Sequence, residues 1–166
     1  ISSYLGVDIS AQMIEQGRRN FANVDNIHFI EADLNGDLDF LKGEPFDVYF
    51  SSYSSPSHVG KEELRCLVEQ VFKASNDHFV IALDLFGRYS AEWPGYWDNN
   101  PDVMHPYNML WLYCDDKEKE LNSPDYFVHF WSADEISTIL HTTAKQFNRT
   151  VELKIVDRSL LVGRHI

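Results

Sequence analysis

The stretch that decides the fold is Tyr4-Leu5-Gly6-Val7-Asp8-Ile9-Ser10, a short apolar run that ends in an acid. Such a run predicts a buried strand, and Ser10 is a residue type that caps the helix after it. From Ala11 to Phe21, the apolar residues keep a helical spacing, with charged and amide side chains on the opposite face. The chain therefore begins with a strand that leads directly into an amphipathic helix.

The same pattern continues along the next 60 or so residues. Residues 27–33 form a second short run that ends in an acid, and 46–50 form a third that enters a serine-rich turn, 51–57. The apolar residues of 64–72 recur at i, i+3, i+4, i+7 and i+8, which predicts an amphipathic helix. Residues 79–83 are continuously apolar, as in a strand buried on both faces. This alternation predicts an α/β domain with a mainly parallel sheet.

Residues 86–131 interrupt the alternation and hold 12 of the 23 aromatic residues, including all four tryptophans. Within this stretch, 109–113 and 126–131 are typical of two strands around a polar turn. We interpret the whole stretch as an aromatic-rich insertion that carries a β-hairpin.

The chain closes with one more helix and two strands. Ser132 and Glu135 have the spacing of a capping box, which predicts that a helix begins there. The alternating residues 151–155 and the apolar run 160–162 predict two final strands. Because too few residues join them for a helical crossover, that last pair must be antiparallel.

Length and composition restrict the class of protein. A chain of 166 residues predicts a single domain, 1–166. The net charge of −12 disfavours binding to nucleic acid or to an anionic membrane surface, and no apolar run reaches the roughly 20 residues that span a bilayer. The cysteines Cys66 and Cys114 are far apart, which favours reduced thiols and a cytoplasmic location. Seven scattered histidines predict no metal site.

Polar side chains follow three of the predicted strands, where ligands bind in open α/β sheets. Asp8 ends the first strand, Asp33 ends the second, and Ser51 follows the third. An acid in the first position is suited to accept hydrogen bonds from ribose hydroxyls, and an acid in the second from an adenine amino group. Each aspartate is equally typical of a turn or a helix cap, and that alternative stays open.

Three motifs together resemble the class I S-adenosylmethionine-dependent methyltransferases: residues 6–10 with Met13 and Arg18, residues 31–34, and residues 46–53. The resemblance implies a Rossmann-like, mostly parallel sheet with an antiparallel last strand. It also implies S-adenosylmethionine as cofactor and methyl transfer to a small-molecule acceptor. The cofactor-binding residues that it implies are Asp8 at the ribose, Ile9 and Met13 along the nucleoside, Asp33 and Leu34 at the adenine, and Ser51 toward the methionine end.

The acceptor is expected near the turn after the third strand. Tyr53 and His58 lie on that turn and are the candidate catalytic residues, although a loop histidine is more often simply solvated. Asp84, which ends the strand 79–83, either faces the same pocket or caps and packs locally. The insertion either forms a lid over the acceptor or packs against the sheet. As a lid it would contact the acceptor through Trp93, Tyr96, Trp97, His105 and Tyr107.

One departure from the family pattern is the missing glycine-rich loop, which normally follows the family's first strand. We therefore expect the chain to be N-terminally incomplete by roughly 40 residues, about one strand, one loop and one helix. A sheet without that strand would have a free apolar edge, which makes a homo-oligomer an option. Two alternative functions remain: an NAD-dependent oxidoreductase, since Asp8 would serve that cofactor's ribose equally well, and a non-catalytic scaffold domain of the same fold.

Overall fold

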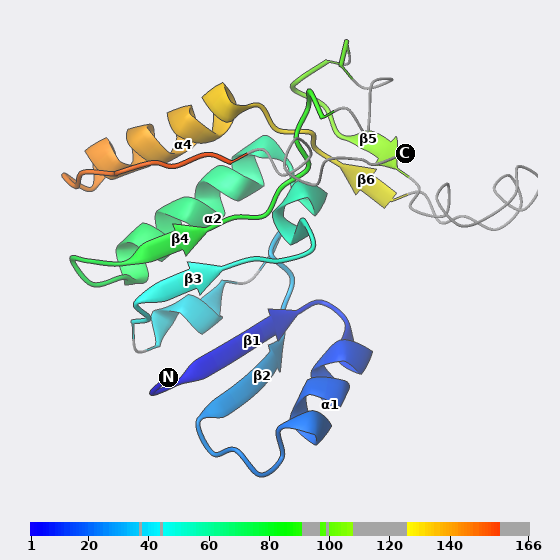
Figure 1. Cartoon of the computed structure of the whole chain (residues 1–166), viewed down its shortest axis with the longest axis vertical. Helices are drawn as coiled ribbons and strands as arrows, with labels where there is room; N and C mark the ends of the chain where they lie inside the picture. The colour runs from blue at the N-terminus through cyan, green and yellow to red at the C-terminus, as the bar shows by residue number, and fades with distance from the viewer. Residues whose placement is uncertain (37, 44, 91–96, 99, 108–125, 157–166) are drawn as a thin grey trace, which may run out of the picture. The chain divides into compact units, whose positions relative to one another are not determined.

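The computed structural model describes residues 1–36, 38–43, 45–90, 97–98, 100–107 and 126–156. These residues fall into two compact units, Ile1–Pro45 and Phe46–Ile166, and each unit is described by itself (Figure 1). The predicted strands at 109–113 and 160–162 lie outside the described residues, as do Trp93 and Tyr96. The expectation of a single domain stays a prediction.

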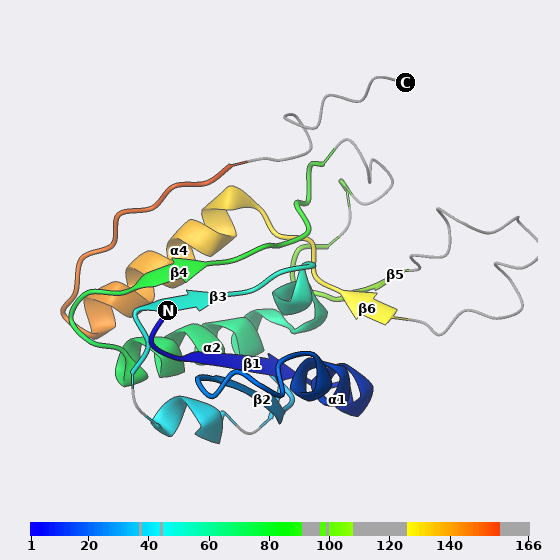
Figure 2. The same ribbon diagram turned by 60° about the horizontal axis from the view of Figure 1, so that its bottom comes forward.

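The first unit is a strand–helix–strand unit. Strand β1 (Tyr4–Asp8) pairs in parallel with β2 (Ile27–Glu31), and helix α1 (Ala11–Asn20) connects them and lies against the pair (Figure 2). Ser10 caps α1, because its hydroxyl accepts a hydrogen bond from the Met13 backbone at 3.4 Å. A short 3₁₀ helix, η1 (Asp39–Lys42), follows β2. The predicted elements of this region are confirmed.

Phe29 is the centre of packing in the first unit. Its ring contacts Tyr4 and Phe21, with centroids 6.1 and 5.8 Å away. Glycines stand where the ring lies against the backbone: a β-carbon on Gly6 would come 2.5 Å from the ring, and one on Gly17 would come 2.8 Å from it. The absence of side chains at these two positions therefore makes room for the ring between β1 and α1.

The second unit repeats the arrangement and adds one helix and an antiparallel strand pair. Strand β3 (Val48–Phe50) pairs in parallel with β4 (Val80–Ala82), and the chain between them forms the 3₁₀ helix η2 (Ser55–His58) and helix α2 (Lys61–Ala74). Helix α4 (Ala133–Gln146) packs beside α2, and strands β5 (His105–Tyr107) and β6 (Tyr126–Val128) form an antiparallel pair (Figure 1). The buried apolar residues of the two helices are Leu64, Val68, Val71, Phe72, Ile136, Ile139, Leu140 and Ala144.

The capping box at the start of α4 is confirmed in full. The Ser132 hydroxyl accepts from the Glu135 backbone at 3.3 Å, and the Glu135 carboxylate accepts from the Ser132 backbone at 2.9 Å. Two parallel pairs, each joined through a helix, confirm the predicted α/β class.

Two sequence expectations need correction. The prediction that the strand of residues 79–83 is buried on both faces is wrong: Val80 is 56% exposed, and its partner Val48 is 54% exposed. Residues 151–155 form no strand, although Val151 and Leu153 are more buried than their neighbours; their predicted partner, 160–162, lies outside the described residues. Strand β6 pairs with β5, and the predicted hairpin strand 109–113 likewise lies outside the described residues.

Candidate functional site

The carboxyl ends of β1 and β2 bring the two predicted cofactor aspartates to one edge. Asp8 is the last residue of β1 and lies opposite Glu31 in the parallel register. The Ala32 backbone donates to the Asp8 carbonyl oxygen at 3.0 Å, and Asp33 is the next residue. Both aspartates are exposed. The first unit therefore places them together, as the order of the strands predicts.

Each aspartate also has the local role that the sequence left open. Asp8 accepts from the Ser10 backbone at 2.8 Å, and Asp33 accepts from the Asn35 backbone at 2.8 Å and from its side-chain amide at 3.2 Å. All these bonds use Oδ1. In the described part of the chain, the Oδ2 atoms of Asp8 and Asp33 have no hydrogen bond, so a ligand can reach them.

Apolar side chains lie close to these carboxylates along the chain. Ile9 is 66% exposed and Met13, in the first turn of α1, is 57% exposed, while Leu34 is half-buried. Exposed carboxylate oxygens next to apolar side chains are the chemistry that a nucleoside requires, since its hydroxyl and amino groups need acceptors and its base needs an apolar surface. The residues present therefore fit the nucleoside part of S-adenosylmethionine.

The turn after β3 is held by the end of β4. The Ser51 hydroxyl accepts from the Asp84 backbone at 3.2 Å, and the Asp84 carboxylate accepts from the Ser54 backbone at 3.3 Å. Asp84 thus has the local packing role that the sequence allowed for it. Between these bonds, Tyr53 and Ser54 adopt left-handed backbone conformations, with φ of 53° and 55°. Such conformations cost of the order of 1 kcal/mol each in residues other than glycine, and they cluster at functional sites.

His58 and Tyr53, the candidate catalytic residues, are both exposed on this segment. The His58 ring lies edge-on to Phe86, which follows β4, and to Tyr126 of β6, with centroids 6.4 Å away in each case. Three chain segments that are distant in sequence therefore bring an imidazole and two aromatic rings together. We call His58, Phe86 and Tyr126 the aromatic triplet.

Ser57, which is fully buried, connects the segments that carry the triplet. Its hydroxyl accepts from the Phe86 backbone at 2.9 Å, and its carbonyl oxygen accepts from the His129 backbone at 2.7 Å. One residue of η2 is thereby bonded both to the segment after β4 and to the segment after β6.

A buried charged cluster lies under the same segments. The Arg88 guanidinium donates to both carboxylate oxygens of Glu135, at 3.0 and 2.9 Å, and to the Phe130 carbonyl oxygen. His129 Nε2 lies 3.7 Å from the Glu135 carboxylate, and Lys61 Nζ lies 4.0 Å from it.

The cluster shifts two pKa values. Burial lowers the pKa of His129, and this effect outweighs the attraction of Glu135. Burial alone would raise the pKa of Glu135. The hydrogen bonds from Ser132, together with the charge of Arg88, exceed that effect and hold the pKa of Glu135 below its ordinary range. The cluster therefore favours an ionised carboxylate beside a neutral imidazole.

The predicted acceptor wall is only partly described. Trp97 is 43% exposed and its indole donates to the Ser90 carbonyl oxygen at 2.9 Å. His105 lies on β5, with Nε2 3.0 Å from the Asn100 carbonyl oxygen, and Tyr107 stands opposite Tyr126 in the register. Phe86 and Tyr126 are not among the predicted site residues. The one signal in the sequence that points to them is their position, after β4 and at the start of β6.

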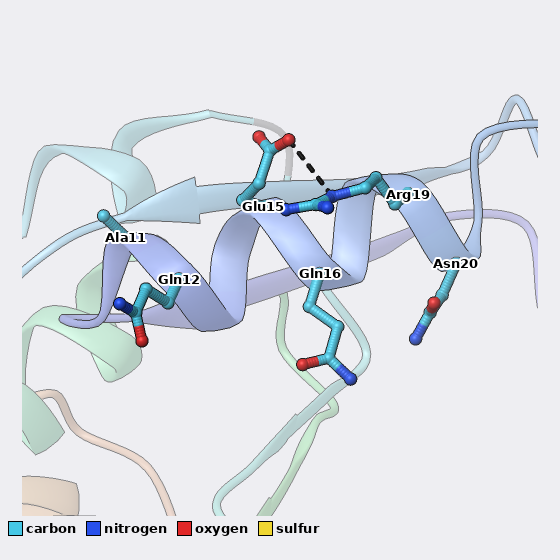
Figure 3. Close-up of a pocket in the computed structure, with 6 residues that line it drawn as sticks. All are labelled: Ala11, Gln12, Glu15, Gln16, Arg19 and Asn20. Atoms are coloured by element: carbon cyan, nitrogen blue, oxygen red, sulfur yellow. Dashed lines mark ion pairs between the residues drawn. The ribbon is translucent and has the colours of Figure 1, made fainter.

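A hollow of about 570 Å³ lies along α1 (Figure 3). It is lined by residues of that helix alone, and Glu15 and Arg19 form an ion pair across it at 3.2 Å. It includes none of the predicted cofactor or acceptor residues, so we assign it no ligand. The lining residues are Ala11, Gln12, Glu15, Gln16, Arg19 and Asn20.

No group of three or more His, Cys, Asp or Glu among the described residues is arranged to hold a metal ion. Among the helices in the part of the chain that the structure describes, none is both long and apolar enough to cross a membrane.

Parallel strand–helix–strand units with polar side chains at the strand ends are typical of Rossmann-like proteins. Comparison with known proteins gives one family match. Residues 1–77 match a family described as "Methyltransferase domain". The match covers 77 of the 166 residues, and the chain has a Rossmann-like fold. The predicted resemblance to methyltransferases and the predicted fold class are confirmed.

Solved structures with the same fold include two described as S-adenosylmethionine-dependent methyltransferases. The protein from Methanosarcina mazei is 13% identical, with a TM-score of 0.57 over 85% of this chain and 68% of its own. The protein from Mesorhizobium loti is 19% identical, with a TM-score of 0.58 over 86% of this chain and 62% of its own. The chain therefore spans about two thirds of the length of these structures. No curated protein matches the chain.

Proposed function

We propose that this chain transfers a methyl group from S-adenosylmethionine to a small-molecule acceptor, in the cytoplasm. The observation that carries the proposal is the placement of Asp8 and Asp33, exposed and at one edge of a parallel strand pair, within the part of the chain that matches the methyltransferase family. The free Oδ2 of Asp8 would accept from the ribose and that of Asp33 from the adenine. Ile9, Met13 and Leu34 would contact the nucleoside.

In this proposal, the turn after β3 receives the acceptor. When bound, S-adenosylmethionine supplies an activated methyl group: the acceptor's lone pair forms a bond to the methyl carbon, and the electron pair of the broken carbon–sulfur bond stays on sulfur. Much of the rate of such a displacement comes from holding the reactants in line. Ser51 and the exposed Tyr53 would hold the reacting groups, and the exposed His58 would take the proton that a hydroxyl or amine acceptor must lose.

The first test is calorimetric titration of the full chain with S-adenosylhomocysteine, in the wild type and in Asp8→Asn. An asparagine keeps an oxygen that can accept from the Ser10 backbone, so the turn is preserved while the charge is lost. We expect affinity to weaken by about 1.5–3 kcal/mol, the range for hydrogen bonds to charged groups, which is roughly 10- to 150-fold in Kd.

Glu31→Gln is the matched control, because Glu31 lies directly opposite Asp8 and is also exposed. We expect this control to change Kd less than twofold. Equal losses of affinity in the two variants would show that this end of the strand pair contributes only its overall negative charge, with no specific role for Asp8. An unchanged affinity in Asp8→Asn would refute the ribose assignment.

Methyl transfer is then measured directly, with radiolabelled S-adenosylmethionine and a panel of small phenols, amines and carboxylic acids. The proposal expects His58→Gln and Tyr53→Phe to lower turnover of the accepted compounds while the affinity for S-adenosylhomocysteine stays within about twofold of wild type. Full turnover in both variants would remove these residues from the acceptor site.

A further inference from the structure

The buried pair Arg88–Glu135 joins parts of the chain that are far apart in sequence. The side chain of Arg88 is 9% exposed and that of Glu135 is 13% exposed, with a shortest separation of 2.9 Å. A buried ion pair is rarely the most stabilising solution, because removing two charges from water costs much of what their attraction returns. The pair is therefore better explained by the geometry that it imposes on the chain than by the stability that it adds.

Arg88 fixes the segment after β4 against the segment after β6. Its backbone donates to the Trp131 carbonyl oxygen at 2.9 Å, and the Trp131 backbone donates to the Phe86 carbonyl oxygen at 2.8 Å. Its guanidinium adds two bonds to the Phe130 carbonyl oxygen, at 3.2 and 3.0 Å. The carboxylate of Glu135, in the first turn of α4, accepts hydrogen bonds from the same guanidinium.

This arrangement lies directly beside the aromatic triplet. Phe86 is two residues before Arg88, and its ring contacts Phe130, with centroids 6.0 Å apart. Ser57 is bonded to the backbones of Phe86 and His129, and His58 is the next residue. Any shift of the Arg88 segment relative to β6 therefore moves Phe86 and Tyr126 against the imidazole of His58.

We propose that Arg88 and Glu135 are positioning residues: their ion pair holds the His58 imidazole in register with Phe86 and Tyr126, on the segment that the proposed function assigns to the acceptor. The proposal rests on the proposed function for its catalytic meaning, but its geometric part can be tested without any methyl acceptor. Arg88 and Glu135 act only through the segments that they hold.

The test compares Glu135→Gln, Arg88→Lys and a matched control. Glutamine at position 135 still accepts from the Ser132 backbone, so the capping box keeps that bond while the charge opposite Arg88 is lost. Lysine at position 88 keeps the charge but not the two-pronged geometry. The control is Glu62→Gln, which removes one of the two carboxylates paired with Arg65 on α2, an exposed contact of 2.8 Å.

Histidine-selective NMR reports on the position of the His58 ring, since nearby aromatic rings shift its carbon-bound proton. The His58→Gln variant identifies the resonance. We expect both Arg88→Lys and Glu135→Gln to move that resonance toward the value of a solvated histidine, and Glu62→Gln to leave it in place. Turnover of accepted panel compounds should fall roughly 10- to 100-fold in the two variants, the range for small misplacements of reacting groups, with S-adenosylhomocysteine affinity within about twofold of wild type.

A His58 resonance that stays in place in folded Glu135→Gln and Arg88→Lys would overturn the proposal. So would a loss of turnover matched by an equal loss of folded protein or of S-adenosylhomocysteine binding, because that pattern indicates general destabilisation. If Glu135→Gln does not fold, the milder Arg88→Lys decides. Failure of the wild type to bind S-adenosylhomocysteine would count against the proposed function and leave the NMR comparison valid.

Discussion

Replacing Gly17 with alanine sets two effects of opposite sign against each other. Alanine is favoured over glycine by about 1 kcal/mol in a helix interior, and Gly17 lies inside α1 with an ordinary backbone conformation. A β-carbon at this position would come 2.8 Å from two atoms of the Phe29 ring, closer than such contacts allow. Overpacking of this kind costs about 1–3 kcal/mol.

The ring has little freedom to move away. Tyr4 and Phe21 contact it, and a β-carbon at Gly6 would meet the same ring from β1. We therefore expect the overpacking to exceed the helical gain, so that Gly17→Ala lowers the free energy of unfolding by about 1 kcal/mol. Urea unfolding followed by circular dichroism measures the change, and hydrogen exchange of peptides from residues 4–31 locates it in the first unit.

The sign of the effect should reverse when the ring is removed. In a Phe29→Leu background the close contact disappears, so Gly17→Ala should stabilise that variant by up to about 1 kcal/mol. Stabilisation of the wild-type chain by Gly17→Ala would refute the argument that the glycine makes room for the ring. Identical effects in the two backgrounds would refute it as well.

Two further predictions concern the second unit. Burial holds the pKa of His129 below its ordinary value of 6.5, so the unfolded chain takes up this proton at a higher pH than the folded chain. The free energy of unfolding should therefore fall as the pH drops below about 6.5, by up to about 1.4 kcal/mol per pH unit. Urea unfolding between pH 7 and 5 measures this dependence, and in His129→Gln the free energy of unfolding should change less with pH. Tyr53 has a left-handed backbone conformation and is 93% exposed, so Tyr53→Gly should relieve backbone strain without loss of packing. We expect this variant to raise the free energy of unfolding by up to about 1 kcal/mol and to lower methyl transfer. A lower free energy of unfolding would show that the tyrosine side chain contributes to packing.

The strand–helix alternation was predictable because the residues that specify each element lie within or next to that element in the sequence. Helix α1 begins after Ser10 and α4 begins at a capping box, and both caps form the expected hydrogen bonds. The spacing of apolar residues likewise places α2, which the structure extends by a few residues at each end. Periodicity and capping depend on neighbours within four positions, and the sequence displays all of them.

The errors concern properties that depend on distant partners. The apolar run at 79–83 predicts a strand, but whether both of its faces are covered depends on what packs against them, and Val80 is half exposed. The alternation from Val151 to Ile155 is strand-like, but a strand also needs a neighbour with which to exchange hydrogen bonds. The role of Arg88 could not be predicted for the same reason, since its partner Glu135 lies 47 residues further on in the sequence.

The candidate site shows why the two interpretations of a strand-end aspartate need not compete. Asp8 and Asp33 each use Oδ1 to hold the local turn, which is the structural role, and each keeps Oδ2 free at an exposed edge. The turn bonds fix the carboxylate in one orientation before any ligand arrives, so less conformational freedom is lost on binding. Asp8→Asn keeps the oxygen that holds the turn and replaces the free Oδ2 by an uncharged amide NH2 that cannot accept from the ribose. It therefore separates the two roles more sharply than alanine, whose side chain could neither hold the turn nor bind the ribose.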